Sequence, residues 1–252
     1  MFRYLFLSIV FLLFGCAGVQ TTSIQTTQKD ITETVKYQGP KARIAVARFE
    51  CKAAKCYRDI GEGLKDMLID ALLQTDRFIV LERGEGFEAL KEEIDLAQSG
   101  YVQQRQAPKK GLMEGADIIV LASIIAFEPN AGGVSGGVGA LLSKVPMIGG
   151  VKIGKQDAYI AAVIRLVDVR SGRILSSTRV EGKASSFKIG GLGGWLAGSV
   201  GLGGGLEVYK NTPMEKAVMV LIDNAVKEIV KHVPESYYRY SPTGREITPQ
   251  KN

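Results

Sequence analysis

The chain has 252 residues, a formal net charge of +6 and 46% hydrophobic residues. This composition is close to that of ordinary globular proteins and excludes a disordered or coiled-coil chain. At about 150 residues per domain, the length allows one or two domains. A single histidine (His232) and three cysteines argue against a histidine-based catalytic or metal centre, so we expect no enzyme, no cofactor and no metal. Lys and Arg form no block, so nucleic acid is not an expected partner.

The N-terminus carries an export signal. Arg3 precedes an uncharged and almost entirely apolar run, Tyr4–Phe14, which is typical of a signal peptide. The run ends in Leu-Phe-Gly-Cys, which is similar to the lipobox of bacterial lipoproteins. We expect removal of residues 1–15 and acylation of Cys16, with palmitate among the acyl chains, which would anchor the chain to outer-membrane lipid with its main domain in the periplasm. The alternative is a plain signal peptide whose cleavage site contains a cysteine.

The segment that follows Cys16 is polar. Residues 16–40 are rich in Thr and Gln and are expected to form a flexible tether. Beyond it, Cys51 and Cys56 are separated by four residues. Exported proteins meet an oxidising compartment, and a metal site would need two further soft ligands nearby. We therefore predict a disulfide that closes a short loop.

Periodicity predicts the elements of one domain over residues 41–233. Alternating or continuous apolar runs predict strands over 43–50, 78–81, 116–127, 156–169 and 173–182, the last two joined by a tight turn at 170–172. Spacings of three and four predict helices over 61–75, 84–98, 108–114 and 213–232. The fold class is then α/β (α+β), with a mixed sheet covered by helices. Residues 234–252 are polar and are expected to form a loose surface tail.

Glycine is the abnormal component of the sequence. Sixteen of the 30 glycines lie in 129–151 and 189–206. Apolar residues alternate there with small ones, and they are Val134, Val138, Leu142, Val151 and Ile153 in the first stretch and Leu192, Leu196, Val200, Leu202 and Leu206 in the second. The pattern predicts β-hairpins at about 134–162 and 180–209 that belong to a transmembrane β-barrel. Flexible loops in water are the alternative.

A barrel made from these hairpins would need several copies of the chain. One copy supplies about four strands, whereas bacterial barrels begin at eight. Open sheet edges cannot face lipid, because unpaired backbone groups are too costly there. A shared barrel therefore predicts a homo-oligomer.

Four blocks of the chain together resemble the CsgG-type curli secretion channels. They are LERGEGFEALKEE (81–93), GADIIVLASIIAFEPNAGG (115–133), YIAAVIRLVDVRSGRILSS (159–177) and YKNTPMEKAV (209–218). With the lipobox, the similarity runs in order from Cys16 to about His232. The resemblance implies an outer-membrane lipoprotein in a ring of nine copies, with a periplasmic α/β domain and two barrel hairpins per copy.

The resemblance also implies a site and a function. The loop after the first strand would line a constriction, and here it carries Lys52, Lys55, Tyr57 and Arg58. A basic ring would favour anionic cargo. The function implied is an oligomeric channel that exports unfolded, curli-like polypeptide by diffusion, with periplasmic accessory proteins as further partners. The alternative is a non-channel lipoprotein whose α/β domain docks a partner envelope protein.

Overall fold

The computed structural model describes residues 37–103, 105, 107–129, 158–184, 202 and 205–247, without the side chains of Arg58 and Glu85. Its main elements are β1 (Ala42–Cys51), α2 (Arg58–Gln74), β2 (Phe78–Leu81), α3 (Glu85–Gln98), β3 (Ile118–Glu128), β4 (Tyr159–Asp168), β5 (Ile174–Lys183) and α6 (Pro213–His232). Two short 3-10 helices, η2 (Glu207–Tyr209) and η3 (Glu235–Tyr237), flank α6. The predicted mixed sheet with helices is confirmed.

The five strands form one sheet in the order β2-β1-β3-β4-β5. β1 runs parallel to β2 and β3, whereas β3, β4 and β5 are antiparallel. The predicted turn joins β4 to β5, and there the Asp168 N–H donates to the Arg173 carbonyl over 2.9 Å. Gly172 in this turn has a φ of 69°, a left-handed conformation that glycine adopts without a steric penalty.

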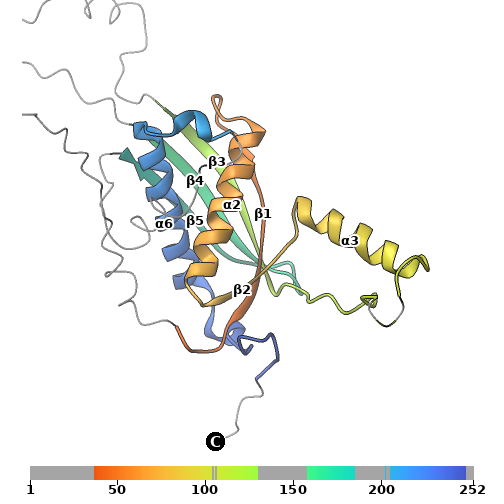
Figure 1. Cartoon of the computed structure of the whole chain (residues 1–252). Helices are drawn as coiled ribbons and strands as arrows, with labels where there is room; N and C mark the ends of the chain where they lie inside the picture. Colours follow the sequence, from red (N-terminus) through yellow and green to blue (C-terminus); the bar gives the residue numbers. More distant parts are fainter. Residues whose placement is uncertain are drawn as a thin grey trace, which may run out of the picture.

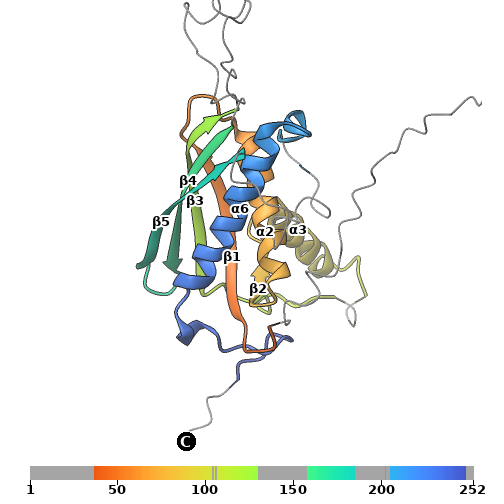
Figure 2. The ribbon, with the colours of Figure 1, turned by 90° about the vertical axis from the view of Figure 1, so that its left-hand side faces the viewer.

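Helices α2 and α6 cover one face of the sheet and leave the other face without a described helix (Figures 1 and 2). On α2 the fully buried residues Leu64, Leu68 and Leu72 recur every four positions and pack into the core. On α6, Val218 and Ile222 are also four positions apart, fully buried and packed into the core. None of the described helices is long and apolar enough to cross a membrane.

Helix α3 stands apart from this two-layer body, beyond the sheet edge formed by β2 (Figure 1). No other described element packs along it. The chain then returns to β3 through residues 99–117, where the helix predicted at 108–114 is wrong, because turns and irregular backbone occupy that stretch. Gly111 there has a φ of 85°, and the Gln98 side-chain amide donates to the Pro108 carbonyl over 2.8 Å. We call residues 85–114 the arm.

The loose tail predicted at 234–252 is also wrong for residues 234–247. The N–H of Lys41 donates to the Tyr240 carbonyl over 2.7 Å, and Tyr240 is only 3% exposed. Tyr238 packs its ring against Phe78, with 6.0 Å between the ring centroids. The tail therefore belongs to the domain, and it is held by residues at the start of the chain's folded part.

Candidate functional site

Both glycine-rich stretches leave the sheet at the same end of the molecule. The first departs after β3 and returns before β4, where Glu128 pairs with Tyr159. The second departs after β5, where Lys183 pairs with Tyr159 and the Ala184 N–H donates to the Ala158 carbonyl over 3.1 Å. Figure 1 shows these strand ends side by side. Because the two stretches begin at the ends of adjacent strands, any structure that they form starts from one small area at this end of the sheet.

The loop between β1 and α2 lies at this same end. The backbone N–H groups of Lys52 and Ala53 both donate to the Ile124 carbonyl of β3, over 2.9 and 3.1 Å. A disulfide joins Cys51 to Cys56, and the side chain of Cys56 belongs to the hydrophobic core. The loop is thus fixed to the sheet beside the point where the first glycine-rich stretch departs.

Two predicted loop lysines form ion pairs. Lys55 Nζ lies 2.5 Å from a carboxylate oxygen of Glu128, the last residue of β3. Lys52 Nζ lies 3.4 Å from the Glu50 carboxylate. All four side chains are largely exposed, so these pairs contribute little to stability. They do lower the net positive charge that the sequence suggests for this loop, a neutralisation that only the fold reveals, because Glu128 is 73 residues away from Lys55.

The other two predicted loop residues, Tyr57 and Arg58, lie at the start of α2. Tyr57 is 70% exposed and precedes the first residue of α2. Arg58 begins α2, and its side chain lies outside the described part of the structure. An exposed aromatic ring at this end of the sheet is available to contact other molecules.

The second glycine-rich stretch returns directly into the core, which corrects one predicted barrel residue. Leu206 is fully buried in the hydrophobic core, and Leu202 packs against that core. The next residues form η2, where the Tyr209 ring meets Phe127 edge-on at 5.5 Å between centroids. The apolar alternation of 192–208 therefore runs on into the core, and Leu206 is a core residue instead of a wall residue. Leu202, another predicted barrel residue, also contacts this core.

The other predicted site residues lie outside the described residues and stay predictions. They are the lipidation site Cys16 and the hairpin positions Val134, Val138, Leu142, Val151, Ile153, Leu192, Leu196 and Val200. The structure contributes to them only the positions of the strands from which the two hairpins would extend.

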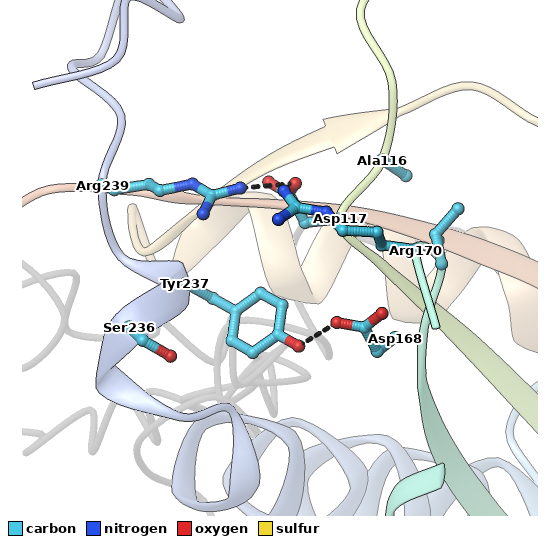
Figure 3. Close-up of a pocket in the computed structure, with 8 residues that line it drawn as sticks. Ala116, Asp117, Asp168, Arg170, Ser236, Tyr237 and Arg239 are labelled. Carbon is cyan, nitrogen blue, oxygen red and sulfur yellow. Dashed lines mark hydrogen bonds and ion pairs between the residues drawn. The ribbon is translucent and has the colours of Figure 1, made fainter. Parts of the chain in front are cut away.

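A cavity of about 310 Å³ opens at the opposite end of the sheet (Figure 3). Asp117 is held there by Arg239, with 2.9 Å between Nη2 and the carboxylate, and by Arg43 at 3.3 Å. The Tyr237 hydroxyl donates to Asp168, and together with hydrogen bonds from Ser171 it lowers the pKa of that carboxyl to about 2.

No local sequence pattern indicates this cavity, because its Asp, Arg and Tyr residues come from distant segments. Both of its carboxylates already have partners, so neither is poised as an acid or base. Within the described residues, no group of three or more His, Cys, Asp or Glu side chains could hold a metal ion. The chemistry visible in the structure is therefore structural, and the candidate site is the end with the loop.

Comparison with protein families gives one decisive match. The family model described as "Curli production assembly/transport component CsgG" matches residues 24–241, which is most of the chain. The chain belongs to the CsgG family. The family is described as a transport component and is not a family of enzymes. No curated protein sequence matches the chain.

Solved structures resemble this CsgG-family chain only distantly. Protein CT253 from Chlamydia trachomatis is 12% identical, with 76% of this chain and 97% of that chain covered and a TM-score of 0.41. Lipoprotein GNA1162 from Neisseria meningitidis is 16% identical, with 56% and 82% covered and a TM-score of 0.30. The PelC dodecamer from Paraburkholderia phytofirmans is 11% identical, with 74% and 89% covered and a TM-score of 0.32.

Proposed function

We propose that this CsgG-family protein is an outer-membrane lipoprotein whose copies assemble into a channel for unfolded polypeptide. The observation that carries the proposal is the convergence at one end of the sheet. The β1–α2 loop and the departure points of both glycine-rich stretches lie there together. A channel needs its membrane-spanning part and its narrow point on one axis, and in the proposed channel both would begin at this end of the domain.

The wall of the channel would come from the two hairpins at about 134–162 and 180–209. The first hairpin would continue β3 and β4, and the second would begin as a continuation of β5, so three of the hairpin strands extend strands that already pair with one another. The second hairpin would return to the domain through Leu206 and η2. Hairpins that extend such paired strands keep their backbone groups hydrogen-bonded, as a bilayer requires. Since four strands cannot close a barrel, the proposal needs a homo-oligomer. Nine copies, periplasmic accessory proteins and curli-like cargo are what family membership suggests.

Alternate residues of the second hairpin provide a matched test of the wall. Leu192→Lys with Leu196→Lys would place charges toward lipid, which costs about 2–4 kcal/mol per charge near the bilayer midplane. Gly193→Lys with Ala197→Lys would place them toward the lumen, where charges are tolerated. The purified lipidated protein should give uniform conductance steps in a planar bilayer. The first variant should lose them, and the second should keep them with altered ion selectivity.

The outcomes separate the channel from the alternative. A well-folded, lipidated wild-type protein that gives no conductance would contradict the channel and favour a lipoprotein that docks a partner envelope protein. Equal conductance in both lysine variants would contradict the hairpin wall while leaving a pore.

The loop lysines test the narrow point separately. Lys52→Glu with Lys55→Glu should reverse the ion selectivity of the channel, because it replaces two positive charges per copy by negative ones. Since Glu128 neutralises Lys55 in the structure, Glu128→Gln should shift selectivity further toward anions than in the wild type. Selectivity that is unchanged in both variants would exclude this loop from the pore.

A further inference from the structure

Helix α3 has an apolar face that is only partly covered within the described structure. Phe87, Leu90, Ile94 and Ala97 share this face; Ala97 is buried and Phe87 and Ile94 are half-buried, whereas Leu90 is 43% exposed. Arg83 and Lys91 lie over the Phe87 ring, so the open part of the face is the part around Leu90. Of the twelve large apolar side chains that are exposed among the described residues, five belong to the arm: Leu90, Leu96, Tyr101, Leu112 and Met113. Isolated exposed apolar residues are ordinary, but five of them within one projecting segment favour a contact of this segment with another molecule.

The second uncovered surface is the face of the sheet opposite α2 and α6, which we call the open face. Its central side chains alternate with the core residues of β3 and β4, and they are Ile119, Leu121, Val163, Arg165 and Val167. All five are half-buried. Cross-strand pairing places Leu121 beside Arg165 and Ile119 beside Val167, so the apolar residues form a continuous band.

The charges of these two surfaces are opposite. Helix α3 contains five acidic residues and one lysine. The open face carries Arg165 near its centre and Arg48 on β1, and neither belongs to an ion pair of the described residues. On β5 the same face carries Arg179 and Lys183, which both pair with Glu181. An acidic helix with an apolar face and a basic sheet with an apolar band are complementary partners.

The two surfaces of one copy cannot meet each other. Figures 1 and 2 place α3 beyond β2, on the side of the sheet that carries α2 and α6, whereas the open face looks the opposite way. Contact between them therefore requires a second copy of the chain. A contact that joins different surfaces of two copies is heterologous, and repeated around an axis it closes a ring.

We propose that α3 of one copy packs across the open face of the next copy, and that this contact builds the ring. The inference rests on the proposed assembly and adds the surfaces that hold it together. The arm acts as a connector: the Arg83 guanidinium donates to the Glu114 carbonyl over 2.5 Å, which ties the start of the arm to its end. The base of the connector is therefore held together by this hydrogen bond.

Cysteine cross-linking in the full-length lipidated protein, in membranes, tests this contact. Leu90→Cys is combined in turn with Leu121→Cys, Val163→Cys and Val167→Cys, and a flexible bismaleimide is added. The native Cys51 and Cys56 are joined to each other and do not react. Leu73→Cys with Val163→Cys is the matched control, because Leu73 on α2 is 46% exposed and lies outside the proposed contact.

We expect a ladder of dimers, trimers and larger species with at least one Leu90 pair, and none with the single variants or the Leu73 control. Dimers from Leu90→Cys alone would show helix-to-helix association and overturn the proposal. If no Leu90 pair cross-links while native mass spectrometry still shows an oligomer, the α3 contact is refuted and the assembly stands. A monomer in that measurement would refute the assembly and the contact together.

Discussion

Asp168 shows how a single side chain joins the C-terminal segment to the sheet. The hydroxyl of Tyr237 donates to its carboxylate, and the pKa of this carboxyl falls from the ordinary 3.8 to about 2. A group whose pKa is lower in the folded chain adds stability above its unfolded pKa, and that stability is lost as the pH falls through the folded pKa. The contribution is therefore complete above about pH 4 and disappears toward pH 2.

Tyr237→Phe should raise the pKa of Asp168, because it removes the main hydrogen bond and keeps the ring. An NMR titration of the carboxyl carbon measures this pKa directly. At neutral pH the wild type should unfold at a higher midpoint concentration of urea than the variant. This difference in midpoint should shrink between about pH 4 and about pH 2. Tyr238→Phe is the control, since the Tyr238 hydroxyl is buried with no described hydrogen-bond partner. An unchanged Asp168 pKa in Tyr237→Phe would contradict the assignment.

At the scale of the elements, Gly182 fixes how closely α6 approaches β5. A Cβ atom at this position would lie 1.9 Å from the Ala217 carbonyl oxygen and 2.8 Å from the Leu221 nitrogen. Both are backbone atoms, so the helix itself would have to move. Gly182→Ala should lower the free energy of unfolding by about 1–3 kcal/mol through overpacking, measured by urea denaturation.

Gly115→Ala is the matched control for that substitution. A Cβ atom at Gly115 meets nothing within 4 Å, and its φ lies outside the left-handed region. Its stability should therefore stay within about 0.5 kcal/mol of the wild type. Equal stability of the two variants would mean that α6 moves away from β5 without a measurable cost.

Local sequence patterns predicted most elements, because each buried face repeats at the period of its own element. Helix α6 follows this rule: Pro213 begins it, and buried residues such as Val218 and Ile222 recur along one side. The same pattern on α3 predicted a helix without saying what its apolar face contacts. Tyr240 could not be placed at all, since its partner Lys41 lies far away in the sequence, at the start of the domain. Leu206 was predicted in the barrel wall because a core residue continues the apolar alternation of the glycine-rich stretch.

At the scale of the whole molecule, the segment that follows the proposed lipidation site and the proposed hairpins would join the domain at opposite ends. The tether joins the domain at Lys41, which Tyr240 holds beside the start of β1. The hairpins depart beside the end of β1, ten residues later, and at about 3.3 Å per residue the two ends are about 33 Å apart. If both enter the same membrane, the tether must run back along the whole domain. From Cys16 to Lys41 it can reach about 85 Å, which is ample.

This geometry predicts a threshold in tether length. Deletion of residues 19–28 leaves a reach of about 50 Å and should preserve the channel. Deletion of residues 19–36 leaves about 25 Å, less than the length of β1, so the hairpins could not reach the bilayer while Cys16 is anchored. Conductance steps in a planar bilayer should persist in the first variant and vanish in the second, although both are lipidated. An eighteen-residue Gly-Ser segment in place of residues 19–36 should restore them, because only length matters. Normal conductance with the long deletion would place the anchor and the hairpins at the same end of the domain, contrary to the structure.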